Sequence, residues 1–186
     1  MTTMLKNLLY ALTCLAFTIM IGGAVYEHLN VVPRWSAAPP VSLSMFQGEY
    51  GLNPALFWMI IHPVNLLLFI LTTVLYWKTE RRKNMVVVFA TYIAILVITN
   101  VYFVPELISI ISTPFSQSVD AALTQRASLW ETLSLVRLFV LLGLALYLFE
   151  GLTKPGTKWK TSSATVDAVA LPAGKKPHTR PTMPVA

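Results

Sequence analysis

The stretch LFWMIIHPVNLLLFI, residues 56–70, is the part of the chain that most restricts its fold. It is apolar enough to enter a lipid bilayer, yet it carries His62, Pro63 and Asn65 near its middle. Polar side chains are costly in hydrocarbon, and they usually face a protein interior or a wet cavity. The stretch therefore predicts a membrane protein and also the place of a functional site.

The composition of the whole chain supports a membrane location. Of its 186 residues, 55% are hydrophobic and 12% are charged, whereas a soluble domain has roughly 25% charged residues. The length suits one domain. Cys14 is the one cysteine, which excludes an internal disulfide, a CxxC redox pair and a multi-cysteine metal site.

Four apolar runs are each long enough to cross a bilayer as a helix. They cover residues 8–27, 54–77, 85–105 and 129–152. The link at 78–84 is short, so the second and third helices must be antiparallel neighbours. We predict an all-α integral membrane protein, an up-down bundle of four transmembrane helices. A short interfacial helix is expected in each outer loop, at 42–50 and at 116–126.

The bundle is expected to occupy residues 1–153, followed by a tail at 154–186. The tail is rich in Ser, Thr, Pro and Lys, a composition typical of disordered segments. A cleaved signal peptide is the alternative for the first run, because Gly22, Gly23 and Ala24 resemble a cleavage site. The length of the run favours a retained helix, in which both glycines permit close helix packing.

The basic residues predict the orientation, and the formal charge of +6 is concentrated at the ends of the apolar runs. Lys6, the cluster at 78–83 and the lysines of the tail fall on one side of a four-span protein. The other side has only Arg34 and Arg126. The positive-inside rule then places both termini in the cytoplasm of a bacterial inner membrane. The bilayer is the predicted partner, and the sequence contains no nucleic-acid module.

Polar side chains of three helices are expected at a similar depth. With a rise of about 1.5 Å per residue, His62 lies about 12 Å below the outer end of its helix, and Asn100 and Arg137 lie about 9 Å below theirs. Glu27 and His28 end the first run just above this level. The pattern predicts one outward-facing polar pocket formed by all four helices.

Helical spacing divides the candidate ligand-binding residues into two faces. One face of the second run carries Trp58, His62, Asn65 and Phe69. One face of the fourth run carries Arg126, Trp130, Ser134 and Arg137. An arginine at this depth is costly without a partner, and Glu106 or Glu27 is the expected carboxylate.

Each of these residues also has a purely structural interpretation. Asn65 and Asn100 are typical of interhelical hydrogen bonds, and Trp130 is typical of the aromatic belt at the membrane surface. His62 and Arg137 would then be packing and anchoring residues. Glu27 and His28 would be ordinary residues at a helix end.

The polar residues could instead form a metal site. Glu27, His28, His62 and Glu106 have the right side chains, but the sequence lacks a tight ligand motif, and we predict neither a metal nor a cofactor. A bis-histidine haem fits less well still, because His28 lies above His62.

Three segments resemble the family of small four-span membrane proteins that includes the fungal anthrone oxygenases. The first is Thr99-Asn100 followed by Val104-Pro105-Glu106-Leu107. The second runs from Trp130 through Ser134 to Arg137. The third is the glycine-containing end of the first span together with the loop at Pro33. The resemblance covers roughly residues 8–152.

The resemblance implies a pocket for a flat hydrophobic substrate that O₂ oxidises without a protein-bound redox cofactor. His62 would be the catalytic base, and Arg137 and Asn100 would stabilise an enolate-type anion. Trp58, Phe69 and Trp130 would stack on the substrate.

Two other functions compete with this one. The chain could be a non-catalytic accessory membrane protein that contacts a partner through its outer loops at 27–53 and 107–128. A small transporter is the third alternative, but four spans without an internal repeat would need to form an oligomer.

Overall fold

The computed structural model describes residues 2–156, and within this range the only regular elements are helices. The first long helix comprises α1 (Thr3–Tyr26), the π-helix η1 (Glu27–Val31) and α2 (Val32–Ser36). A 3₁₀-helix η2 (Val41–Phe46) precedes α3 (Ala55–Tyr76). Next come α4 (Arg82–Ile98), the π-helix η3 (Thr99–Phe103) and α5 (Val104–Ile111), and α6 (Ala121–Thr153) follows.

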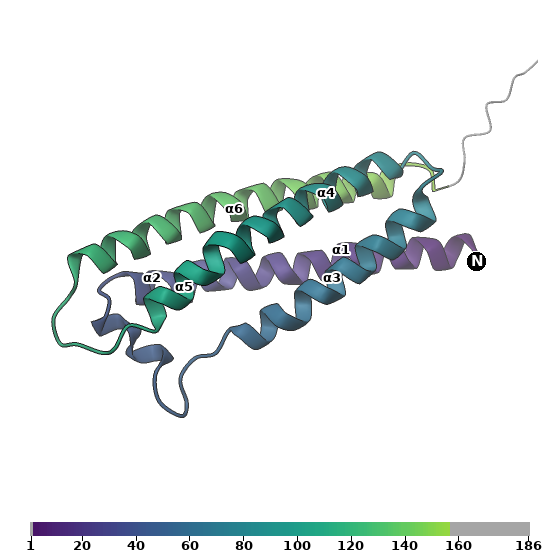
Figure 1. Ribbon diagram of the computed structural model, residues 1–186. Coiled ribbons are helices and arrows are strands. Elements are labelled where there is room, and N and C mark those ends of the chain that lie inside the picture. Colours follow the sequence, from purple (N-terminus) through teal and green to yellow (C-terminus); the bar gives the residue numbers. More distant parts are fainter. Residues whose placement is uncertain (1, 157–186) are drawn as a thin grey trace, which may run out of the picture.

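The helices form one elongated up-down bundle, which confirms the predicted architecture (Figure 1). Helices α1 and α4 each pack against both α3 and α6. Four continuous helices are long and apolar enough to cross a membrane, so the chain is a multi-pass membrane protein. They cover Thr3–Ser36, Ala55–Tyr76, Arg82–Ile111 and Ala121–Thr153.

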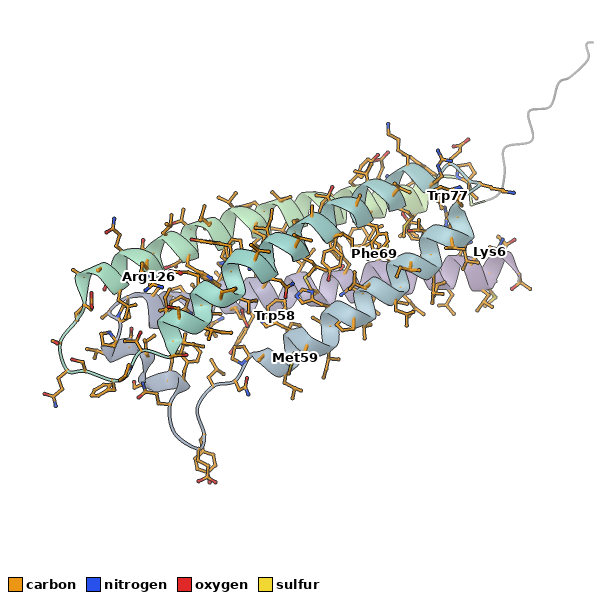
Figure 2. The ribbon with its side chains drawn as sticks, viewed as in Figure 1. Lys6, Trp58, Met59, Phe69, Trp77 and Arg126 are labelled. Carbon is orange, nitrogen blue, oxygen red and sulfur yellow. The ribbon has the colours of Figure 1, made fainter. Side chains whose placement is uncertain are left out.

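The two ends of the bundle differ in their connections. The start of α1, the α3–α4 link and the end of α6 lie together, and we call this the terminal end (Figure 1). The opposite end holds α2, η2 and the α5–α6 connection, and we call it the loop end. Figure 2 shows Lys6 and Trp77 at the terminal end and Arg126 at the loop end.

Two hydrophobic clusters fill the interior. The membrane core includes Tyr10, Phe17, Phe69, Tyr92 and Leu148 among its buried members. The cap core lies at the loop end and is formed by Val32, Trp35, Leu43, Phe103, Ile110, Leu123, Ala127 and Trp130. The cap core thus joins the connections of the loop end to the ends of the long helices.

The helices at the loop end are longer than the predicted spans. Residues 27–36, expected as a connection, continue the first helix, and the third helix runs to Ile111. The short helix predicted at 42–50 is present as η2, but the connection between Ile111 and Ala121 has no helix of its own. Asp120 caps α6 by accepting a hydrogen bond from the Leu123 N–H at 3.0 Å, so the residues expected as a surface helix start α6 itself.

The terminal end is closed by a network around Arg81, whose side chain is only 7% exposed. Its guanidinium donates to the carbonyl oxygens of Leu152 and Lys154, to Asn7 Oδ1 and to the Tyr76 hydroxyl. These bonds join α1, α3 and α6. The predicted tail lies outside the described residues from residue 157 onward.

Candidate functional site

The predicted face of α3 points into the bundle. Figure 2 shows Trp58 and Phe69 turned toward the other helices and Met59 on the opposite side of α3. Trp58 Nε1 donates to Glu27 Oε1 at 2.9 Å, and the Trp58 ring stacks on the His62 ring with 5.4 Å between centroids. His62 Nδ1 lies 2.7 Å from the Tyr92 hydroxyl. Glu27, Trp58, His62 and Tyr92 therefore form one connected chain across η1, α3 and α4.

Arg137 approaches this chain from α6. Its Nη1 donates to Thr99 Oγ1 at 2.9 Å and its Nη2 donates to Ser134 Oγ at 3.1 Å. The guanidinium also lies over the Phe103 ring, 4.2 Å from the centroid, which is a cation–π distance. Both of its hydrogen-bond acceptors are neutral hydroxyls.

No carboxylate of the described residues lies within ion-pairing distance of Arg137. Glu27 and His62 interact with its charge through space, but no hydrogen bond joins Arg137 to either of them. The predicted partnership with Glu106 is wrong, because Glu106 Oε1 accepts a hydrogen bond from Arg126 Nε at 2.8 Å. Arg137 thus keeps its charge among helices with only neutral direct partners.

The two π-helices position Glu27 and Thr99 at this level. Each π-turn begins six residues before a proline, Pro33 in the first helix and Pro105 in the third. Proline has no N–H, and its ring clashes with the carbonyl four residues earlier. The Val32 N–H instead bonds to the Glu27 carbonyl, five residues back, and η3 repeats this pattern. Such π-turns inside helices are frequent at functional sites.

A groove of about 300 Å³ runs between the third and fourth long helices. Its lining residues are Ile95, Ile98, Tyr102, Phe103, Leu133, Val136, Arg137 and Val140. Arg137 is the one charged residue among them. The surface that the groove exposes is almost entirely apolar, and the Arg137 nitrogens are turned toward Thr99 and Ser134 instead.

The Asn100 side chain makes no hydrogen bond to Arg137 or His62, which corrects its predicted role. Its side chain is exposed, and Nδ2 donates to the Leu96 carbonyl of its own helix at 2.8 Å. Thr99, its neighbour, occupies the inward position instead. Asn100 therefore has no contact through which it could stabilise an anion next to Arg137.

Trp130 and Phe69 are packing residues in this structure. Trp130 belongs to the cap core, and its Nε1 donates to the Phe103 carbonyl at 2.9 Å. Phe69 is fully buried and packs on Phe17, Phe89 and Tyr92 in the membrane core. Neither ring lines the groove.

Asn65 and His28 lie apart from the groove. Asn65 is fully buried, and its Nδ2 donates to the carbonyls of Ile61 and Ala16. The first ring nitrogen of His28, Nδ1, lies 2.9 Å from the Ala24 carbonyl, and Nε2 is buried without a partner among the described residues. Within residues 2–156, no group of three or more His, Cys, Asp or Glu side chains converges as a metal site would require.

Sequence reasoning missed Tyr92, Thr99 and Phe103 as members of the cluster. Tyr92 and Thr99 are seven residues apart, which places them on one face of a helix. That spacing could have identified Tyr92 as the partner of His62 and Thr99 as the partner of Arg137. Phe103 gave no such signal, because aromatic residues are frequent near the ends of membrane spans.

No protein-family model, curated protein or solved structure matches the chain in the comparisons made with it.

Proposed function

We propose that the protein binds a small aromatic or quinone-like molecule next to Arg137, in the outer half of a bacterial inner membrane. The distribution of Lys and Arg supports this placement, with the terminal end in the cytoplasm and the loop end outside. Lys6, Lys78, Arg82 and Lys83 all belong to the terminal end. The position of Arg137 carries the proposal.

A buried guanidinium is stabilised most strongly by an anion, and two neutral hydroxyls provide weaker compensation. Arg137 has only such hydroxyls as direct hydrogen-bond partners within the described residues, and it lines an apolar groove. The carboxylate of Glu27 acts on the guanidinium only through space, and a ligand with a negatively charged oxygen would supply a direct partner. The surrounding apolar wall would hold the body of that ligand.

The reaction best suited to this arrangement is the oxidation implied by the resemblance to the anthrone oxygenases. When Nδ1–H of His62 donates to the Tyr92 oxygen, Nε2 keeps a free lone pair and can take a proton from an activated methylene carbon. Arg137 would stabilise the resulting enolate-type anion. O₂ is the oxidant: one of its oxygen atoms becomes the new carbonyl, and the other leaves as water with the two methylene hydrogens.

A non-catalytic accessory role is the second candidate, and the packing around His62 favours it. Trp58 stacks on the His62 ring and Tyr92 binds Nδ1, while His62 is not among the residues that line the groove. A partner would then contact the loop end, where the cap core supports the outer loops.

Turnover of an anthrone by the purified protein in lipid nanodiscs separates the two candidates. We expect His62→Ala to lower turnover about 100-fold, the typical contribution of general base catalysis. Asn100→Ala is the matched control and should turn over at the wild-type rate, because its side chain is exposed. Equal rates for wild type and His62→Ala would remove His62 from the mechanism. If the wild-type protein shows no turnover, the accessory role becomes the better-supported function.

A further inference from the structure

The α3–α4 link at the terminal end presents three exposed basic side chains, those of Lys78, Arg82 and Lys83. No salt bridge among the described residues involves any of them. Glu80 is the one acidic residue of the link, and it is exposed as well. The link therefore forms a surface of net positive charge at this end of the bundle.

Arg82 differs from the two lysines because an aromatic ring holds it. Its guanidinium carbon Cζ lies 5.2 Å from the centroid of the Trp77 ring, which is a cation–π distance. Trp77 follows the last residue of α3 and is 51% exposed, at the terminal end of the molecule (Figure 2). No hydrogen bond joins the Arg82 guanidinium to another residue within the range 2–156, so its N–H groups are available to a molecule at the surface.

The link lies at the level where the apolar part of the bundle ends. No Asp, Glu, Lys or Arg occurs in α3, and Lys78 is the first charged residue after it. On α4, Arg82 and Lys83 precede the apolar run that begins at Met85. A tryptophan at the end of a membrane span is typical of the membrane–water interface. The Arg82 guanidinium is therefore at the depth of phospholipid phosphates.

We propose that the α3–α4 link binds the headgroup of an anionic phospholipid, with the lipid phosphate on the Arg82 guanidinium. Arginine donates paired hydrogen bonds to phosphate oxygens. The Trp77 ring already restricts the Arg82 side chain, so less conformational freedom is lost when the phosphate binds. Lys78 and Lys83 favour a headgroup such as phosphatidylglycerol, because they repel the cation that phosphatidylcholine carries beside its phosphate.

The position of Arg82 on Trp77 carries the proposal, and the charge of the link supports it. Basic residues in a short link follow from membrane orientation alone. Orientation does not require one of them to lie against an exposed aromatic ring. Variants that keep the charge and change the geometry therefore separate a headgroup site from a general attraction between the link and an anionic membrane.

Native mass spectrometry of the full chain released from detergent measures lipid binding. Dioleoyl phosphatidylglycerol and dioleoyl phosphatidylcholine are added in equal amounts, so the acyl chains are identical and only the headgroups differ. We expect a bound phosphatidylglycerol with an affinity at least about fivefold above that of phosphatidylcholine, the typical effect of one basic side chain near an anionic headgroup. Every variant keeps residues 157–186, so lipid attraction by the basic residues of that segment is the same in all of them.

Three variants assign the binding to Arg82 and Trp77. Arg82→Gln removes the charge and should weaken phosphatidylglycerol binding at least about tenfold. Trp77→Leu keeps every charge and should weaken it about threefold through loss of the cation–π contact. Arg82→Lys should also weaken it about threefold, because an ammonium lacks the planar fork of donors. Arg34→Gln is the matched control, since Arg34 is exposed on α2 at the loop end, and it should bind the lipid as wild type does.

Four results would overturn the inference. Equal affinity for the two lipids excludes selection of an anionic headgroup. Wild-type binding by either Trp77→Leu or Arg82→Lys shows a general attraction of charge in place of a site on Arg82. An equal loss in Arg34→Gln and Arg82→Gln places the binding elsewhere. Displacement of phosphatidylglycerol by millimolar inorganic phosphate shows that the guanidinium takes a soluble phosphate and not a lipid.

Discussion

The two arginines inside the bundle are held in very different ways. Arg81, at the terminal end, makes four hydrogen bonds to three helices or their ends, and lies 5.3 Å and 5.2 Å from the ring centroids of Tyr10 and Tyr76. Arg137, near the loop end, makes two hydrogen bonds, one of them to Ser134 on its own helix.

This difference separates a cation that joins three helices from one with fewer direct partners. The acceptors of Arg81 include the carbonyls of Leu152 and Lys154, which belong to the last turn of α6 and its end and have no further helical turn to bond to them. The acceptors of Arg137 are side-chain hydroxyls, and the Thr99 hydroxyl also donates to the Ile95 carbonyl at 2.7 Å. Arg81 thus joins α1, α3 and the end of α6, whereas Arg137 joins α6 only to η3.

Replacing Arg81 is expected to have the largest effect on stability. Arg81→Met leaves the carbonyls of Leu152 and Lys154 without their donor and should lower the free energy of unfolding by about 3 kcal/mol, because each orphaned buried acceptor costs about 1–3 kcal/mol. Thermal unfolding in detergent measures the change. Arg82→Met is the control, because Arg82 is exposed. Equal losses from the two variants would contradict the structural role of Arg81.

The second prediction tests the packing beside Arg81. A Cβ at Gly151 would collide with the Tyr10 hydroxyl, which itself donates to the Leu148 carbonyl at 2.8 Å. Gly151→Ala should therefore cost about 1–3 kcal/mol through overpacking. Gly143→Ala, on the same helix with open space around it, should raise stability by up to about 1 kcal/mol. Similar melting temperatures for both variants would show that the terminal end is loosely packed.

Tyr92→Phe tests the connected chain of Glu27, Trp58, His62 and Tyr92, and its expected effect on stability is smaller. It removes the hydroxyl that binds His62 Nδ1 and should cost about 1 kcal/mol, the typical net value of one hydrogen bond. Tyr147→Phe is the control, since the Tyr147 hydroxyl has no hydrogen bond among the described residues and Tyr147 does not line the groove. If Tyr92 positions His62, anthrone turnover falls in the first variant and stays constant in the second. Unchanged turnover in both would leave Tyr92 a packing residue.

Arg137→Met is expected to change stability least, by less than about 1 kcal/mol in either direction. It loses two hydrogen bonds to hydroxyls but also removes the cost of keeping a charge among apolar side chains. Unfolding of the ligand-free protein in detergent checks the value. A loss as large as that of Arg81→Met would show that both arginines are structural and would break the contrast between them.

Much of the architecture was predictable from the sequence. Four apolar runs and a short basic link were enough for the bundle, and the spacing of Trp58, His62 and Asn65 predicted the inward face of α3. These predictions succeed because burial of a helix face and the length of a span depend on local sequence alone.

The sequence alone did not predict the direction in which Asn100 points or the residues that Arg137 contacts. The rise per residue gives the depth of Asn100, but not its direction around the helix axis. Neighbouring residues on a helix differ in direction by about 100°, so Thr99 faces inward and Asn100 outward. The pairing of Glu106 with Arg126 depends on how far α5 and α6 extend beyond the spans, and the prolines Pro33 and Pro105 had indicated earlier helix ends.

The two π-turns change the direction in which each long helix presents its side chains. Each turn takes one more residue into its hydrogen-bonded ring than an α-turn does, so the helix beyond it continues at a different angle around its axis. The same long helix therefore presents one stripe of side chains to the membrane core and a differently rotated stripe to the cap core. Side chains before each π-turn pack in the membrane core, and those at its end and beyond pack in the cap core, so each of these two long helices carries two separate packing faces.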